Sequence, residues 1–591
     1  MSNSSVGSAL LGIFFCGLGG FVGCTPGSNP EPTATPASQA NAAPQSSTAP
    51  VAATPPADAQ ATPASLSASV GGTAPDKGAV PGWAGQPGEP FDVKQYFASR
   101  EPPPDNAAPL YLSALAQISG ELGDERAKAL GASIGKLADI DKLQSGAIQP
   151  QQVEQVLNDA AEAVKQLDLA QSKSGCVFLT GYSIDTLLPH VQAAREVARL
   201  SSLQLFHARE KQDFAIAEGA VRRCLHLSRD LQPRGFLVCQ LVSIAMDTVV
   251  LTGIERVTLN DPQLTALQCD QLLSLLIEHE QRGLDRHQES IRTEYIFARN
   301  TIDDLKSGRR TFADFLELIG PSTPKQNEPA IEPTLNYDAE IAACNRLFAL
   351  AIKESQVPFA QVAVKSAFRD EVDRVQAAAK TAALTARQTG KTEAPLLMLF
   401  LVPGINAVRE ATTRSAANLA GIQALIALRR YELTHGHFPT TLAEATAESI
   451  LQQKVLDDPY SGQPMRYAIL GGKPTVYSVG KDLKDDGGEA DWKHGQQPGD
   501  YLFVLAPRPG SSLTPPKAVA APPKPAEPMA AENAKLESRV WTSSVGTKIE
   551  ATFMRLEGEV VVLKKKDDSL LRVPLTKLIA SDQQWIRESR R

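Results

Sequence analysis

Apolar residues recur at three- and four-residue spacing from about Tyr96 to Arg430, and this pattern constrains the fold more than any other feature of the chain. Leu110, Leu115 and Ile118 are one example. Such spacing places apolar side chains along one face of an α-helix, which must then pack against a neighbouring element. We therefore expect an α-helical body at residues 92–401.

Breaks in this pattern mark the expected helix ends. One break falls at Gly235, and another is the loop from Gly320 to Pro333. A third is Asn260-Asp261-Pro262, where Asp261 is expected to cap a new helix with Pro262 at its first position. Helix pairs joined by short loops are therefore the expected unit of the body.

The stretch from Leu203 to Pro233 resembles one degenerate tetratricopeptide repeat. Small Ala208 and Ala217 would let two helices approach closely. Larger apolar residues would fill the seam between them: Phe214, Leu225 and Leu227. No convincing second copy follows at the period of about 34 residues that such repeats have. A helical bundle and a degenerate repeat array both remain open, and either would serve as a scaffold or a protein-binding surface.

The amino-terminal residues 1–24 have the character of an export signal, because Leu10 to Cys24 is apolar but too short for a confident membrane span. Phe21-Val22-Gly23-Cys24 resembles a lipobox, which implies that Cys24 is lipidated and becomes the mature amino terminus. A plain cleaved signal and an uncleaved anchor remain alternatives. Residues 25–91 are rich in Ala, Pro, Thr and Ser, a composition typical of a disordered linker. We expect an extracytoplasmic protein, anchored by lipid in a bacterial cell envelope.

Two of the seven cysteines, Cys16 and Cys24, belong to the signal. The other five lie in apolar contexts without a C-x-x-C pair: Cys176, Cys224, Cys239, Cys269 and Cys344. Zinc binding is therefore not expected, and these residues are read as small buried hydrophobes. One or two disulfides remain open for an exported protein.

Residues 402–506 have a different pattern. A long helix ends at Gly436, a D-P-Y-S-G turn follows at Asp458–Gly462, and a β-hairpin is expected around Gly471-Gly472. This module, together with the acidic loop Tyr477–Asp491, resembles the carboxy-terminal domain of type II secretion major pseudopilins. The resemblance implies a small α+β fold.

The acidic loop is the candidate metal site of this module, and the resemblance implies that it binds calcium. Carboxylates in a Gly-rich turn supply the oxygen ligands that calcium prefers. The candidate ligands are Asp482, Asp485, Asp486, Glu489 and Asp491. A solvated acidic turn is the alternative. The stem helix lies some 400 residues into the chain, so a filament subunit is not expected.

A second Pro/Ala-rich linker, residues 507–537, precedes β-patterned sequence at residues 538–591. Alternating Ile549, Ala551 and Phe553 and the closing Leu575-x-x-Leu578 resemble the SLA1 homology domain 1, an SH3-like β-barrel found in proteins of planctomycete-like bacteria. The family's roles are adaptor function, cytoskeletal-protein and ubiquitin binding, and self-association. The expected peptide-binding residues are Trp541, Phe553, Lys564, Lys565, Lys566 and Trp585. A barrel that only packs against the body is the alternative.

The net charge argues against nucleic-acid binding, and the motif content argues against enzyme activity. The net charge is −7 and the longest basic tract is Lys564–Lys566, so nucleic acid is not an expected partner. The chain has no H-E-x-x-H, P-loop or Rossmann fingerprint, so no enzyme is expected. We predict a mainly α, multidomain, non-enzymatic scaffold or adaptor that binds a protein partner through its carboxy-terminal domain. An accessory component of a type II secretion or pilus-like system is the alternative.

Overall fold

The computed structural model describes residues 79–583 except 179–180, 284, 320–333, 390, 403, 453–455, 491–498, 514–538, 544–546, 558–559, 566–569 and 580. The chain divides into two compact units, Met1–Pro516 and Lys517–Arg591. The described part is mainly helical, with two small antiparallel sheets, as the sequence predicts. The predicted export signal with Cys24 and the predicted loop from Gly320 to Pro333 lie outside the described residues.

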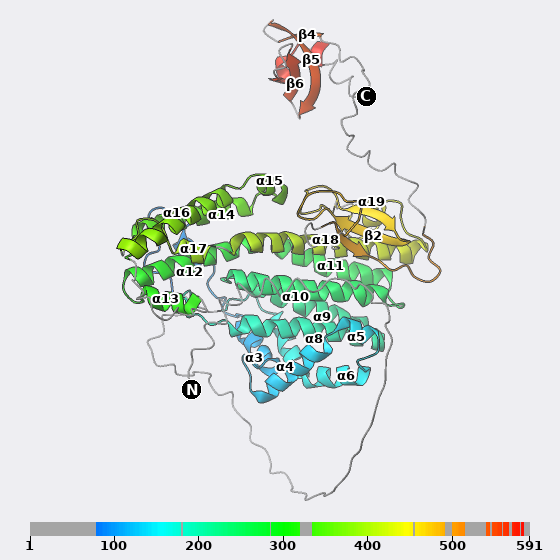
Figure 1. The fold of residues 1–591 in the computed structure, drawn as a ribbon. Helices are drawn as coiled ribbons and strands as arrows, with labels where there is room; N and C mark the ends of the chain where they lie inside the picture. Colours follow the sequence, from blue (N-terminus) through cyan, green and yellow to red (C-terminus); the bar gives the residue numbers. More distant parts are fainter. Residues whose placement is uncertain are drawn as a thin grey trace, which may run out of the picture. The chain divides into compact units, whose positions relative to one another are not determined.

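The first unit contains nearly all of the helices (Figure 1). In chain order they are α2 (Val93–Ala98), α3 (Ala108–Ile118), α4 (Glu125–Leu137), α5 (Ile140–Gln144), α6 (Pro150–Asp159), α7 (Ala161–Ala170), α8 (Pro189–Lys211), α9 (Phe214–Asp230), α10 (Leu237–Arg256), η2 (Thr258–Asn260), α11 (Ala266–Arg282), α12 (Arg286–Lys306), α13 (Phe312–Ile319), α14 (Tyr337–Ser355), α15 (Phe359–Val364), α16 (Ala367–Thr389), α17 (Met398–Leu401), α18 (Ile405–His435) and α19 (Leu442–Ala447).

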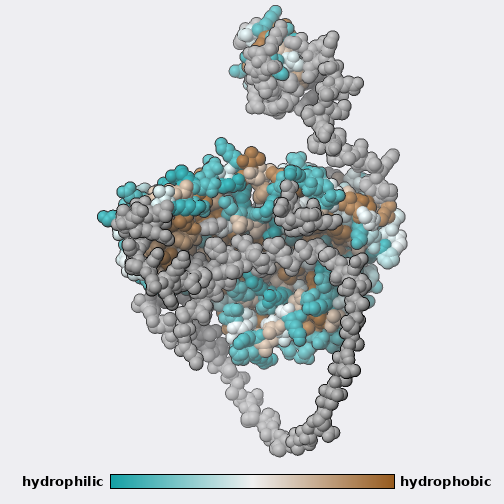
Figure 2. Space-filling model, viewed as in Figure 1, coloured by the Kyte–Doolittle hydropathy of each residue, from teal (hydrophilic) through white to brown (hydrophobic). Residues whose placement is uncertain are grey.

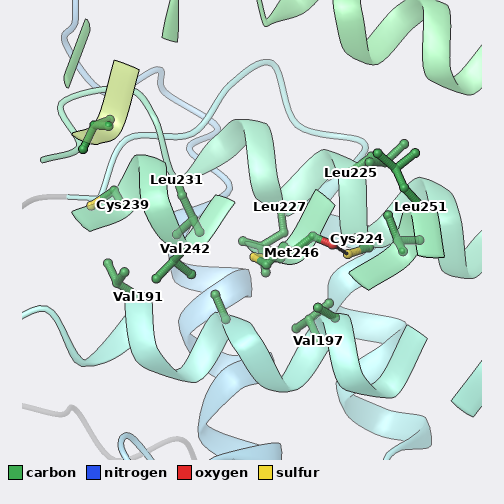
Figure 3. Close-up of a cluster of buried hydrophobic side chains, with 14 of the residues drawn as sticks. Val191, Val197, Cys224, Leu225, Leu227, Leu231, Cys239, Val242, Met246 and Leu251 are labelled. Carbon is green, nitrogen blue, oxygen red and sulfur yellow. Dashed lines mark hydrogen bonds between the residues drawn. The ribbon is translucent and has the colours of Figure 1, made fainter. Parts of the chain in front are cut away.

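Helices α8, α9 and α10 pack against one another at the centre of the body. The α8–α9 connection is tight because Gln212 takes a left-handed conformation (φ 55°) and the Asp213 carboxylate caps α9 by accepting from the Ala215 N–H. Ala208 and Ala217 are buried at this connection, as the sequence predicts. Figure 3 shows how apolar side chains of the three helices meet in one cluster. Residues 203–233 thus contain a helix–turn–helix pair.

Helix α10 is apolar around most of its circumference because other helices surround it. Among the described residues, the stretch Leu237–Asn260 is the one helix long and apolar enough to cross a membrane by length and composition. However, 61% of its apolar window is buried inside the protein. It contacts α8, α9, α12 and α18, so we describe it as a core helix.

The predicted start of the helix after α10 is wrong. Helix α11 begins at Ala266, and its cap is Thr265, whose side chain accepts from the Gln268 N–H while the Gln268 side chain accepts from the Thr265 N–H. Asp261 instead accepts from the Gln263 N–H in a turn. The reciprocal Thr265–Gln268 capping box satisfies two backbone donors and sets the helix start.

The described part of residues 436–505 contains α19 and a three-stranded antiparallel sheet in the order β1 (Arg466–Leu470), β2 (Lys473–Ser478) and β3 (Tyr501–Val504). Helix α18 ends at Gly436 with φ 73°, as predicted. The β1–β2 hairpin turns at Gly471 and Gly472, both with positive φ, and this confirms the predicted hairpin. Strands β2 and β3 and helix α19 contact α18.

Helix α18 joins the two regions that the sequence separates at residue 402. It packs against α10 and α11 as well as against β2 and β3. One continuous hydrophobic core runs from Trp83 to Leu505. Residues 92–401 and 402–506 therefore form part of one compact unit and do not separate at the predicted boundary.

The second unit is a four-stranded antiparallel sheet in the order β4 (Arg539–Thr542), β5 (Lys548–Glu557), β6 (Val560–Lys565) and β7 (Leu570–Pro574), followed by η3 (Leu575–Lys577). A register shift interrupts the β5–β6 pairing between Phe553 and Arg555. After η3 the chain returns to β4, because Leu578 pairs with Ser543. The unit has its own core, formed by Trp541, Ala551, Val561, Leu563, Leu575 and Leu578.

Candidate functional site

The candidate peptide-binding residues of the second unit do not share one surface. Trp541 is 0% exposed, and its indole Nε1–H donates to the Ala551 carbonyl over 2.8 Å. The Arg539 guanidinium lies 4.7 Å from the indole centroid. Phe553 is partly buried against the same core. Trp541 therefore has no exposed surface for a peptide here and stabilises the core instead.

Strand alternation separates the basic residues Lys564 and Lys565. Lys564 pairs with Thr552, whereas Lys565 pairs with Ala551, a core residue. Since successive side chains of a strand point to opposite faces, the two lysines lie on opposite faces of the sheet. Lys566 and Trp585 lie outside the described residues.

One face of this sheet carries exposed side chains, and we call it the outer face. Val540 is 52% exposed and lies opposite Glu550 in the register. The pairs on this face define it: Val540–Glu550, Thr542–Lys548 and Thr552–Lys564. Val540 is the exposed apolar residue of a face that otherwise presents polar and charged side chains.

Asp582, which sequence reasoning missed, joins the end of the chain to β4. Its buried carboxylate accepts from the Thr542 N–H and from the Arg539 guanidinium, both over 2.7 Å. These bonds tie the segment after η3 to the first strand. A lone Asp in a polar tail carries no local signal for this role, because both partners lie about 40 positions earlier.

Local hydrogen bonds and one ion pair involve two of the five candidate calcium ligands in the acidic loop of the first unit. Asp482 accepts from the Lys484 N–H over 3.1 Å. Asp485 accepts from the Gly487 N–H and pairs with the Arg466 guanidinium. Within the described part of the chain, no three His, Cys, Asp or Glu side chains are arranged to hold a metal ion. Calcium binding thus stays a prediction.

Asp500, directly before β3, contacts the acidic loop, although the sequence did not single it out. It is buried, and it accepts from the Gly488 N–H over 2.7 Å, while its Oδ1 has no partner among the described residues. Burial raises the pKa of Asp500 to about 6, and the charges of Asp485 and Asp486 act in the same direction. Asp491 lies outside the described residues.

Asp458 is the centre of the D-P-Y-S-G turn. Its fully buried carboxylate accepts from the backbone N–H of Tyr460 and Val479 and from the hydroxyls of Ser461 and Ser478. The two bonds to Ser478 and Val479 fasten the turn to the end of β2. The motif therefore has a structural role that requires a carboxylate with four donors around it.

Comparisons with protein-family models, with curated proteins and with solved structures find no match. The resemblances to the SLA1 homology domain 1 and to pseudopilins remain predictions from sequence motifs.

The helical body contains a buried Ser–Asp–His arrangement that differs from a catalytic triad. Asp247 accepts from the Ser228 hydroxyl over 2.6 Å and contacts His279 Nε2 at 3.0 Å and the Arg286 guanidinium at 3.1 Å. In a triad the histidine, and not the aspartate, must contact the serine hydroxyl to take its proton. Here the aspartate lies between them, so the cluster crosslinks α9, α10, α11 and α12.

The five described cysteines are buried and unpaired, so none forms the disulfides that the sequence left open. Figure 3 shows Cys224 and Cys239 among aliphatic side chains, with the Cys224 thiol directed at the Met246 carbonyl, 3.7 Å away. Burial raises the pKa of all five thiols. They therefore behave as small core residues, as predicted.

A cavity of about 210 Å³ lies between α9 and α11. Arg229 and Arg282 reach the same carboxylate oxygen of Glu278, at 3.6 and 3.3 Å. Arg222 also lines the cavity and pairs with Glu218. Each guanidinium thus has an acidic partner within the protein.

Proposed function

We propose that this protein is an exported, envelope-associated scaffold that binds a protein partner through its carboxy-terminal unit. The observation that carries the proposal is that residues 539–583 build a compact β unit with a core of its own. A unit with its own core can present a binding surface without the rest of the chain. The resemblance to the SLA1 homology domain 1 supports protein as the ligand class.

The outer face is the surface that we assign to the partner. Val540 would supply the apolar contact, and Lys548, Glu550 and Lys564 would supply charged contacts around it. Trp541 would act indirectly by holding β4 in place. This assignment replaces the expectation of a direct contact at Trp541.

The polar chemistry of the body supports a scaffold. The buried carboxylates of Asp247, Glu289 and Asp458 each accept several hydrogen bonds from the protein itself. Figure 2 shows that most of the coloured residues on the visible face are hydrophilic, with apolar residues in small groups. Both features are typical of a stable platform.

In the alternative role, the protein would contact a secretion machine through residues 402–506, which include α18. Residues Gly421 to Arg429 of α18 are buried without interruption, so this part of the helix is not available to pack against a second copy. A contact would instead use the exposed acidic loop. We therefore favour the scaffold proposal.

The experiment is in-cell crosslinking of the full-length protein, with partners identified by mass spectrometry. The Val540→Asp variant is expected to lose the partner that crosslinks to the second unit, because a charge on the outer face opposes apolar contact. The matched control is Lys577→Asp on η3, which is also exposed but lies away from the outer face. Crosslinks that map to residues 402–506 and survive Val540→Asp would contradict the scaffold proposal and favour the secretion role.

A further inference from the structure

A second cavity, about 340 Å³ in volume, lies where the chain after β3 crosses the carboxy-terminal half of α18. Pro262, from the connection between α10 and α11, contributes to one wall. Asn260, Ala506, Pro507 and Pro509 also line the cavity, and Arg429 of α18 and Arg508 complete its lining. We call this space the proline cavity. Its volume falls within the range of about 300–1,000 Å³ that is usual for small-ligand sites.

Two guanidinium groups line the proline cavity. The Arg429 side chain is 1% exposed; it pairs with the Glu432 carboxylate and donates to the Ala506 carbonyl over 2.6 Å. Its Nε has no hydrogen-bond acceptor within the described part of the chain. Arg508 donates to backbone carbonyls of the 261–264 turn. Among the described residues that line the cavity, none is acidic.

Among the described residues around the proline cavity, one cation, the Arg508 guanidinium, contacts backbone carbonyls and has no carboxylate partner. Glu432 pairs with the Arg429 guanidinium through one oxygen, and its other oxygen accepts from the backbone N–H of Arg508, not from the Arg508 side chain. The neighbouring Arg430 is neutralised by Asp270, at 2.9 Å to both oxygens. The Asp261 carboxylate accepts from a backbone N–H in its own turn. Burial lowers the pKa of Arg429, and the nearby positive charge of Arg508 lowers it further. The carboxylate of Glu432 acts in the opposite direction and raises it.

We propose that the proline cavity binds a small monocarboxylate with an apolar body. A carboxylate would neutralise the single surplus charge and accept hydrogen bonds from guanidinium donors, a pairing that is both strong and directional. The proline rings and the Ala506 methyl would contact the apolar body of the ligand. An inorganic anion would leave these apolar walls without a partner. The site is separate from the proposed partner surface and needs nothing from it.

The test is calorimetric titration of phenylacetate into the purified full-length protein, with phenylacetamide as its neutral analogue. We expect saturable binding of phenylacetate and at least about tenfold weaker binding of phenylacetamide, because the amide can accept hydrogen bonds but cannot neutralise a guanidinium charge. Inorganic phosphate is a third ligand and is expected to bind more weakly than phenylacetate.

Cavity-filling variants locate the site. Ala506→Phe is expected to abolish phenylacetate binding, because the new ring occupies the cavity while Arg429 and the backbone carbonyl remain. The control Val504→Phe adds the same ring at an exposed position of β3 outside the cavity and is expected to leave binding unchanged. If Ala506→Phe lowers the Tm, Pro262→Trp fills the cavity from another wall.

Three outcomes would overturn the proposal. One is the absence of saturable heat with phenylacetate at millimolar concentration. Another is equal affinity for the acid and the amide, or for phenylacetate and phosphate. The third is undiminished binding in both cavity-filling variants.

Discussion

Gly421 of α18 is expected to be intolerant of even one added methyl group. A Cβ atom at this position would lie 2.4 Å from the Phe503 ring of β3, where ordinary van der Waals contact begins at 3.4 Å. Phe503 is itself buried and is paired with Val476 of β2, so the ring has to move by about 1 Å against packed neighbours. Gly421→Ala therefore tests how tightly α18 and the sheet are joined.

Two opposing terms set the size of the effect. Replacing Gly with Ala inside a helix stabilises it by about 0.5–1 kcal/mol. Overpacking a core typically costs about 1–3 kcal/mol, and more when the obstacle is a rigid ring. We expect a net destabilisation of about 1–2 kcal/mol for Gly421→Ala.

Gly135 of α4 offers a matched control, because the same substitution meets ordinary surroundings there. Its added Cβ would have Arg199 Nη1 at 3.6 Å as its nearest neighbour, which is ordinary contact with a flexible group. Gly135→Ala should therefore stabilise the protein by about 0.5–1 kcal/mol. The two variants should differ in sign although the chemical change is identical.

The assay is urea unfolding of the full-length protein, followed by far-UV circular dichroism, with midpoints and slopes compared among the variants. Adding Phe503→Leu to Gly421→Ala should recover part of the loss, because the smaller side chain leaves room for the methyl group. A Gly421→Ala protein as stable as the wild type, or more stable, would refute the packing of β3 against α18 that we describe.

Four further predictions concern buried polar groups and the second unit. Asp458→Asn should lower the stability of the first unit by about 2–4 kcal/mol, because an amide cannot accept from all four donors. Ser461→Ala should cost only about 1 kcal/mol in the same urea assay. Equal effects of the two substitutions would contradict the role of Asp458. Burial raises the pKa of Glu340 from 4.5 to about 7. The contribution of Glu340 to stability is therefore present below pH 4.5 and is lost as the pH rises to 7, a loss of about 3 kcal/mol. A Glu340→Gln protein whose Tm falls as steeply between pH 5 and pH 8 as that of the wild type would contradict this. Trp541→Ala should cost about 3–5 kcal/mol and make the second unit sensitive to protease while the helical circular dichroism of the body persists; a resistant second unit would place Trp541 outside its core. Calcium should raise the Tm of the wild type more than that of Asp486→Asn, and equal shifts would reduce the loop to an acidic turn.

Much of the architecture follows from local patterns. The helical periodicity, the helix stop at Gly436, the Gly471-Gly472 hairpin and the alternation in β5 all depend on residues within a few positions of one another. The start of α11 shows the limit of this reasoning, because two residues within five positions, Asp261 and Thr265, can each cap a helix. Thr265 is the cap because its reciprocal bonds with Gln268 satisfy two backbone N–H groups at the start of the helix.

The sites are less predictable than the elements. Strand alternation, a local rule, is sufficient to place Lys564 and Lys565 on opposite faces of the sheet. The burial of Trp541 and the roles of Asp582 and Asp500 depend on segments that come together only in the folded chain. A carboxylate in a loop has the same local sequence signal whether it faces solvent or a buried donor.

The sequence by itself determined that the body is helical, that a β-hairpin follows a long helix, and that the chain ends in a small β unit. Local backbone preferences and the spacing of apolar side chains suffice for these features. Only the tertiary structure decided that α18 merges the predicted module with the body, and that Arg429, Arg508 and three prolines line one cavity. The physical reason is that burial and charge pairing depend on contacts between residues up to about 250 positions apart, which no local pattern specifies.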